Sequence, residues 1–194
     1  MKTLGNVVLF STAIVCPAAL AISIYPGVLN DLLFSAILLG ILVIPVIAIL
    51  ALVALIVFAY LGKLKYVRPP WAQAAVVFAI LSCTFLLLLF YVPRRIAFAA
   101  SRTAFEELVP QAVEQATHLN RRVGVFEVDD YAADPRGGVY FRVYQGADGI
   151  GPDRMSYGFV ANPNSEGTPF GAARYCTFSL GHNWHWFCAS DDYY

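Results

Sequence analysis

The β-rich part of the chain is decided by residues 175–189, which read YCTFSLGHNWHWFCA. Two runs of alternating side chains flank residues 181–183, a Gly-His-Asn triplet whose members tolerate the positive φ angles of a hairpin loop. Pairing Leu180 with Trp184 makes one face of this hairpin wholly apolar, and a shift of one residue would destroy that face. The predicted apolar face consists of Cys176, Phe178, Leu180, Trp184, Trp186 and Cys188.

The same register sets Cys176 directly opposite Cys188. Opposed residues of an antiparallel pair lie about 4.5–5.5 Å apart at Cα, which is within reach of a disulfide. We therefore predict a Cys176–Cys188 disulfide, which requires an oxidising compartment. The alternative is a pair of buried free thiols. The other two cysteines, Cys16 and Cys83, lie in apolar segments and are predicted to stay free.

Alternation with a period of two extends upstream of the hairpin, for example at Val139, Phe141 and Val143. It predicts an antiparallel sheet of four or five strands over residues 121–189. A helical apolar spacing precedes it over residues 96–117. Residues 94–194 are accordingly predicted to form one α+β domain.

The remainder of the chain has a different composition. Of the 194 residues 59% are hydrophobic, and residues 1–93 carry only Lys2, Asp31, Lys63, Lys65 and Arg68 as charges. The other twenty-one charged residues all lie in residues 94–194. This distribution excludes a disordered chain, a coiled coil and a single soluble globule.

Three uncharged segments, at about residues 4–25, 32–61 and 71–92, have the length of membrane spans. A bilayer core needs roughly 20 apolar residues of helix, and these runs lack the alternation of a strand. The second segment is long enough to require tilt or a kink, for which Pro45 is the natural point. The predicted fold class is an α+β membrane protein, with a transmembrane region over residues 1–93 and three transmembrane helices before the small domain.

The first segment has an alternative interpretation as a signal peptide. Lys2, an apolar run and Ala19-Leu20-Ala21 together resemble a secretory signal with its cleavage site. Cleavage would leave two spans and the same predicted orientation of the domain.

Loop charges predict the orientation. Lys63, Lys65 and Arg68 lie in one short loop without an acid, which is therefore expected on the cytoplasmic side. Arg94 and Arg95 follow the third span and are expected at the lipid headgroups as anchors. The prediction is a multi-pass protein of the cell (plasma or inner) membrane, with its C-terminal domain outside the cytoplasm.

Several function classes are disfavoured by what the sequence lacks. No ionisable residue lies within a predicted span, which argues against a pump, a proton-coupled transporter or an ion channel. Residues 94–194 carry 9 arginines and 12 acids, and such an acidic domain is not expected to bind nucleic acid. No nucleophile-elbow or phosphate-binding motif occurs, so we predict no enzyme and no cofactor.

Two sets of residues are candidates for a site. His182 and His185 have a spacing that suits a metal, although no third ligand is assigned. Tyr140, Tyr144 and Tyr175 form a candidate binding face on the sheet.

The predicted function is a non-catalytic multi-pass membrane protein that displays a small extracytoplasmic domain to a protein or an envelope polymer. Its partners are then the lipid bilayer and that protein or polymer. One alternative is a sensor or regulatory subunit of a larger membrane complex, which binds a small ligand through the outer domain. A lesser alternative is a metal-dependent hydrolase that uses His182 and His185.

Overall fold

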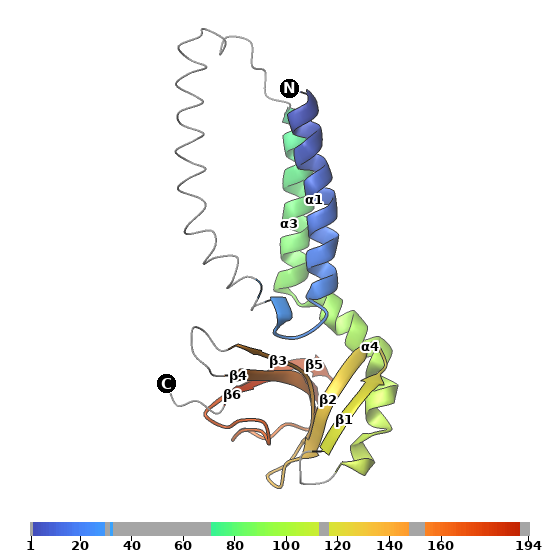
Figure 1. The fold of residues 1–194 in the computed structure, drawn as a ribbon, viewed down its shortest axis with the longest axis vertical. Helices are drawn as coiled ribbons and strands as arrows, with labels where there is room; N and C mark the ends of the chain where they lie inside the picture. Colours follow the sequence, from blue (N-terminus) through green and yellow to red (C-terminus); the bar gives the residue numbers. More distant parts are fainter. Residues whose placement is uncertain (1, 30–31, 33–70, 113–116, 148–153, 191–194) are drawn as a thin grey trace.

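The molecule has a helical end and a sheet end (Figure 1). Helices α1 (Lys2–Ile22) and α3 (Trp71–Leu89) stand side by side, and α4 (Val92–Glu106) leads from α3 to the sheet. This computed structural model describes residues 2–29, 32, 71–112, 117–147 and 154–190. The predicted second span over residues 32–61 lies, except for Leu32, outside the described residues.

Helices α1 and α3 run in the same direction. Near their starts, Gln73 Nε2 donates a hydrogen bond to Asn6 Oδ1 over 3.0 Å. At their other ends, Tyr25 and Tyr91 both contact aromatic rings of the sheet. Both helices therefore end against the same domain.

The break between α3 and α4 follows from two residues. Tyr91 adopts a left-handed conformation with φ 53°, and Pro93 occupies the first turn of α4, where its missing N–H costs nothing. Within the described chain, no single helix is long and apolar enough to cross a membrane. Residues 75–89 and 92–106 together reach the length and apolar composition of one span, by those two criteria only, and are bent by 50° relative to each other.

The helical stretch predicted over residues 96–117 is too long. Helix α4 ends at Glu106, a short 3-10 turn follows at Val109–Gln111, and the first strand already begins at Thr117. Pro110 lies in that turn and cannot continue an α-helix, because it has no N–H to donate.

The sheet has six antiparallel strands instead of the predicted four or five, in the order β1-β2-β3-β4-β6-β5. The predicted sheet begins at residue 121, where Val123 and Val125 alternate with Arg122 and Gly124 as in a single strand. The structure instead turns the chain at Gly124 and Val125, so that the strand over residues 126–133 is the one that the prediction lacks. The strands are β1 (Thr117–Val123), β2 (Phe126–Ala133), β3 (Val139–Ala147), β4 (Arg154–Ala161), β5 (Arg174–Gly181) and β6 (Trp184–Ser190).

The main core lies between α4 and one face of the sheet and is built from aromatic rings. Phe98 of α4 lies 4.9 Å from Phe159, and Phe105 lies 5.2 Å from Phe141, measured between ring centroids. The first pair is tilted and the second is edge-on, and such pairs add to the free energy gained by burying their apolar surface. A second cluster on the opposite face contains Tyr140, Val160, Phe187 and Ala189, with Phe170 and Tyr175 packed against it.

The hairpin prediction is confirmed in the body of the strands and wrong at the tip. Cys176 pairs with Cys188, with a Cα–Cα distance of 5.2 Å, and the two form the predicted disulfide. At the tip the register shifts between Ser179 and Gly181, so that Gly181 replaces Leu180 as the partner of Trp184. His182 and Asn183 both have positive φ, and a two-residue turn of this kind leaves Leu180 as a bulge.

Candidate functional site

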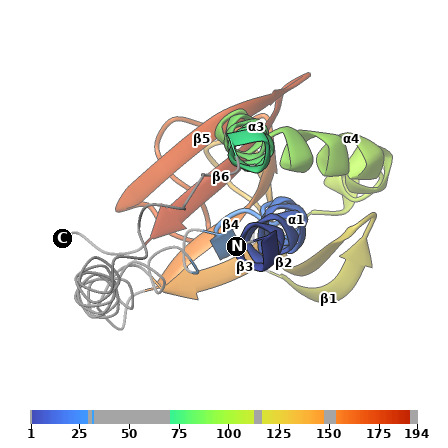
Figure 2. The same ribbon diagram turned by 90° about the horizontal axis from the view of Figure 1, so that it is seen from above.

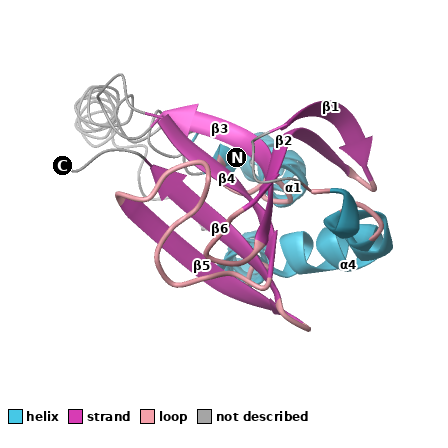
Figure 3. Ribbon diagram, turned by 90° about the horizontal axis from the view of Figure 1, so that it is seen from below, coloured by secondary structure: helices cyan, strands magenta, loops and turns pink. Residues whose placement is uncertain are grey.

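The loop that joins β4 to β5, residues 162–173, covers the face of the sheet opposite the main core. Figure 3 shows it passing across β6 and β5. Beneath it lie the buried side chains of Tyr140, Val160 and Phe187. Long connections held in one conformation are often functional, so this loop and the side chains that hold it are the candidate site.

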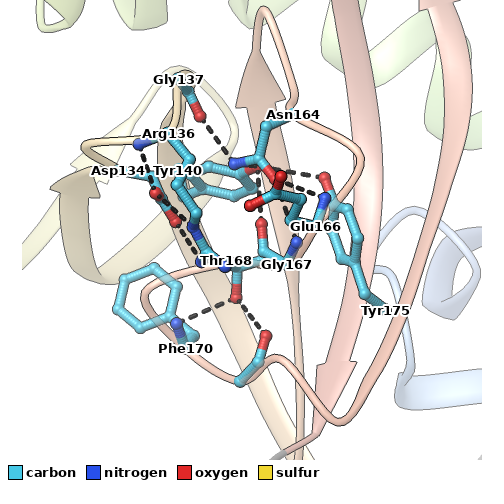
Figure 4. Close-up of polar contacts among 11 residues, drawn as sticks. Asp134, Arg136, Gly137, Tyr140, Asn164, Glu166, Gly167, Thr168, Phe170 and Tyr175 are labelled. Atoms are coloured by element: carbon cyan, nitrogen blue, oxygen red, sulfur yellow. Dashed lines mark hydrogen bonds and ion pairs between the residues drawn. The ribbon is translucent and has the colours of Figure 1, made fainter.

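Asn164 is the central side chain of this loop (Figure 4). Its Nδ2 donates to the Gly137 carbonyl over 2.9 Å and to the Tyr140 hydroxyl over 3.1 Å. Its Oδ1 accepts the N–H groups of Glu166 and Gly167 at 2.8 and 3.0 Å. Two donors and two acceptor positions are thus all used, which fixes the loop to the β2–β3 turn and to strand β3.

Two tyrosines continue the network. The Tyr140 hydroxyl donates to the Gly167 carbonyl over 3.1 Å and lies 3.1 Å from the Tyr175 hydroxyl. Because the single proton of Tyr140 goes to Gly167, Tyr175 is the donor to Tyr140. Burial raises the pKa of both phenols, so both are neutral at physiological pH and serve as hydrogen-bonding groups.

The β2–β3 turn is held by an ion pair. Asp134 Oδ1 accepts the backbone N–H and Nε of Arg136, both over 2.9 Å, and Oδ2 accepts Nη2 over 2.7 Å. These bonds hold the pKa of the buried Asp134 carboxyl below its usual value. Because Gly137 lies in the same turn, the turn presents its carbonyl to Asn164 in a fixed position.

The far end of the loop packs on the sheet. The Thr168 hydroxyl donates to the Gly171 carbonyl over 3.0 Å and accepts the Phe170 N–H over 2.9 Å. Phe170 stacks on Phe187, with 6.4 Å between centroids, and the Arg142 guanidinium lies over its ring. Arg142 in turn forms ion pairs with Asp129 and Asp130.

The structure brings two of the three predicted tyrosines together. Tyr140 and Tyr175 share the loop-covered face, whereas Tyr144 packs against the main core on the opposite face. The strand β3 register shifts between Arg142 and Tyr144, and the extra residue reverses the direction of the side chains beyond it. Tyr144 instead stacks with Tyr157, its partner on β4.

The histidine candidates do not lie in a cluster of ligands. His182 occupies the exposed hairpin turn, and His185 lies on β6 opposite Val160 and Ser179. In the part of the chain that the structure describes, no three His, Cys, Asp or Glu side chains come together as a metal site would require.

The two predicted headgroup anchors, Arg94 and Arg95, differ in exposure. Arg95 is exposed, but only 5% of the Arg94 surface is, and its guanidinium lies 4.4 Å from the Trp186 ring centroid and 5.1 Å from that of Tyr91. Burial lowers the Arg94 pKa to about 10, which leaves the side chain protonated at neutral pH. Arg94 thus fastens the α3–α4 break to the β5–β6 hairpin by cation–π contacts. Lys63, Lys65 and Arg68 lie outside the described residues.

A scan of protein-family models finds no match for the chain, and searches of curated proteins and of solved structures find none either.

The residues that sequence reasoning missed are those that hold the loop, above all Asn164, Asp134 and Arg136. Both Asn162-Pro163-Asn164 and Asp134-Pro135-Arg136 could be recognised as turns from their residue types. An Asn or Asp that caps the N–H groups following it is the signal that was available. Chemically, the site is a platform of neutral phenols, a fully hydrogen-bonded Asn164 side chain and an internal Asp134–Arg136 ion pair, and its exposed tip is formed by Ser165 and Glu166.

Proposed function

We propose that this chain is a multi-pass protein of the cell (plasma or inner) membrane, and that it displays its disulfide-bonded domain outside the cytoplasm for binding. The observation that carries the proposal is the parallel pair α1 and α3, apolar on its outer surface, with the same end of both helices seated on one domain. Phe10 and Phe78 leave 69% and 73% of their surface exposed on this pair. Exposed apolar surface of this extent is typical of an interface with lipid or protein.

The polar residues of α1 also suit an apolar surrounding. Ser11 Oγ donates to the Val7 carbonyl over 2.9 Å, and Thr12 Oγ1 donates to the Val8 carbonyl over 2.8 Å. Neither hydroxyl then needs water, as a spanning helix requires. The parallel direction supports three spans, over residues 4–25, 32–61 and 71–92, because the middle one returns the chain to the start of α3.

For the domain we propose binding to a protein or an envelope polymer without catalysis. The loop over residues 162–173 supports this role, since its interior is committed to internal hydrogen bonds and its tip faces outward. The neutral phenols of Tyr140 and Tyr175 offer no general base, so the site is suited to recognition.

Membrane insertion and orientation are tested by thiol counting on the full chain in its membrane. After alkaline carbonate extraction and blocking of free thiols, reduction should expose two new thiols in the membrane fraction. A Cys176→Ser variant should lose this reduction-dependent signal, whereas Cys83→Ser, the matched control, should keep it. Extraction of the chain into the soluble fraction, or four thiols free from the start, would argue against the proposal.

Binding is tested by placing a photoreactive amino acid at Ser165, the exposed tip of the loop. Cross-linking to an envelope protein or polymer should occur and should be lost when Asn164→Ala releases the loop. The same probe at the exposed Thr103 of α4 is the control. Equal cross-linking from both positions would contradict a binding role for the loop.

A further inference from the structure

The two edges of the sheet are built differently. Strand β1 carries His118, Arg121 and Arg122, and its register is broken between His118 and Arg121, where Asn120 has φ 41°. Charges and a bulge on an edge strand are the usual protection against pairing with another sheet. The β1 edge is thus closed to further strands.

The β5 edge lacks this protection along residues 175–179, because its own bulge, at Leu180, lies at the hairpin tip. Its residues 175–180 read YCTFSL, without a charge or a proline, and Arg174 lies only at the start of the strand. Among the described residues β6 is the only strand that pairs with β5. Phe178 leaves 41% of its surface exposed at this edge, and Ser179 is exposed beside it.

The disulfide fixes the edge strand β5 to its neighbour β6. Cys176 of β5 is bonded to Cys188 of β6, and the Phe178 ring stacks on Trp186 with 4.3 Å between centroids. An ordered, uncharged edge strand presents a row of backbone donors and acceptors that is ready for another strand.

We propose that β5 pairs antiparallel with β5 of a second copy of this chain, so that the two sheets join across a two-fold axis. The strand is complementary to itself, because antiparallel pairing centred on Phe178, which sets Phe178 opposite its own copy and Thr177 opposite Ser179, brings no like charges together and moves the two Arg174 side chains to opposite ends. The exposed Phe178 rings then lie near the axis and are covered by the pairing.

The position of β5 relative to the helices agrees with this axis. Figure 2 looks along α1 and α3, and β5 and β6 run broadside across the view. A two-fold axis perpendicular to this part of the sheet is therefore parallel to the helices. Both copies then have their helices pointing the same way, as two copies in one membrane must. This shared orientation rests on the proposed membrane insertion.

The test measures the mass of the full chain in detergent by light scattering over a range of concentrations. The wild type should be a dimer that dissociates on dilution. A Thr177→Lys, Ser179→Lys double variant, which gives β5 the charges that protect β1, should weaken the dimer by about tenfold or more, because like charges then face each other. Thr103→Lys, a control on an exposed position of α4, should leave the dimer unchanged.

A photoreactive amino acid at Phe178 should in addition give a cross-linked homodimer whose linked peptides both contain β5. Monomeric wild type at all concentrations, a dimer that survives the double variant, or cross-linking from Phe178 to another protein alone would each overturn the proposal. Carbonate extraction separates the two proposals. A chain that stays in the membrane but is a monomer contradicts only the proposed dimer. A chain that carbonate extracts from the membrane contradicts the proposed membrane function. A cooperative unfolding transition of tryptophan fluorescence, as in the wild type, shows that the double variant is folded.

Discussion

At the scale of single residues, Asn164 is expected to stabilise the domain, because all four hydrogen-bonding positions of its side chain are used. Each such bond contributes a net stabilisation of about 1 kcal/mol. We expect Asn164→Ala to lower the free energy of unfolding of the domain by about 2–3 kcal/mol, measured by urea titration of tryptophan fluorescence. Ser165→Ala, an exposed neighbour, should change it by less than about 0.5 kcal/mol. Equal stabilities would show that other contacts hold the loop.

The Asp134 carboxyl makes the stability of the domain depend on pH. Its hydrogen bonds from Arg136 lower its pKa from the ordinary 3.8, so the folded state prefers the ionised carboxylate. The stabilisation is complete above pH 3.8 and is lost as the pH falls through the lower folded pKa. Asp134→Asn should therefore reduce the melting temperature at neutral pH and flatten its fall in acid. Glu107→Gln, at an exposed position, should leave the wild-type profile in place.

At the scale of elements, the β5–β6 hairpin depends on its disulfide. Cross-linking residues 12 apart in the sequence stabilises a fold by about 3 kcal/mol, largely by restricting the unfolded chain. Reduction of the wild type should lower its melting temperature by several degrees, and Cys188→Ser should have this lower value with or without reductant. Cys83→Ser should respond to reductant as the wild type does. If reductant had no effect on the wild type, the disulfide would contribute nothing measurable.

The hairpin also shows how far a sequence can predict an element. Its register followed from two independent constraints, an apolar face and the Cys176–Cys188 pairing, and both belong to the local pattern. Bulges do not, because one extra residue reverses every side chain beyond it, as happens at Tyr144. The network around Asn164 was beyond reach for another reason, since its partners Gly137 and Tyr140 come from a distant turn and strand.

At the scale of the whole molecule, two aromatic junctions join the helices to the sheet. Arg94, Tyr91 and Trp186 connect the end of α3 to the β5–β6 hairpin. On the other side, the Tyr25 hydroxyl donates to the Val125 carbonyl over 3.3 Å and accepts the Glu127 N–H over 3.2 Å. Attachment near both ends of the sheet fixes its tilt relative to the helices, which a single junction would not.

The Tyr25 junction can be loosened in two steps, because its ring and its hydroxyl make separate contacts. Tyr25→Phe keeps the edge-on contact with Phe126, 5.4 Å between centroids, and frees the Val125 carbonyl and the Glu127 N–H, of which only the N–H is visible to hydrogen exchange. Hydrogen exchange should then accelerate at Glu127 alone, while Tyr25→Ala should accelerate it over the whole β1–β2 turn. Peptides from β4 and β6 should exchange as in the wild type in both variants, because their hydrogen bonds lie within the sheet. Uniform acceleration across all strands would instead mean that the junction stabilises the domain itself, and that seating on the helices is inseparable from folding.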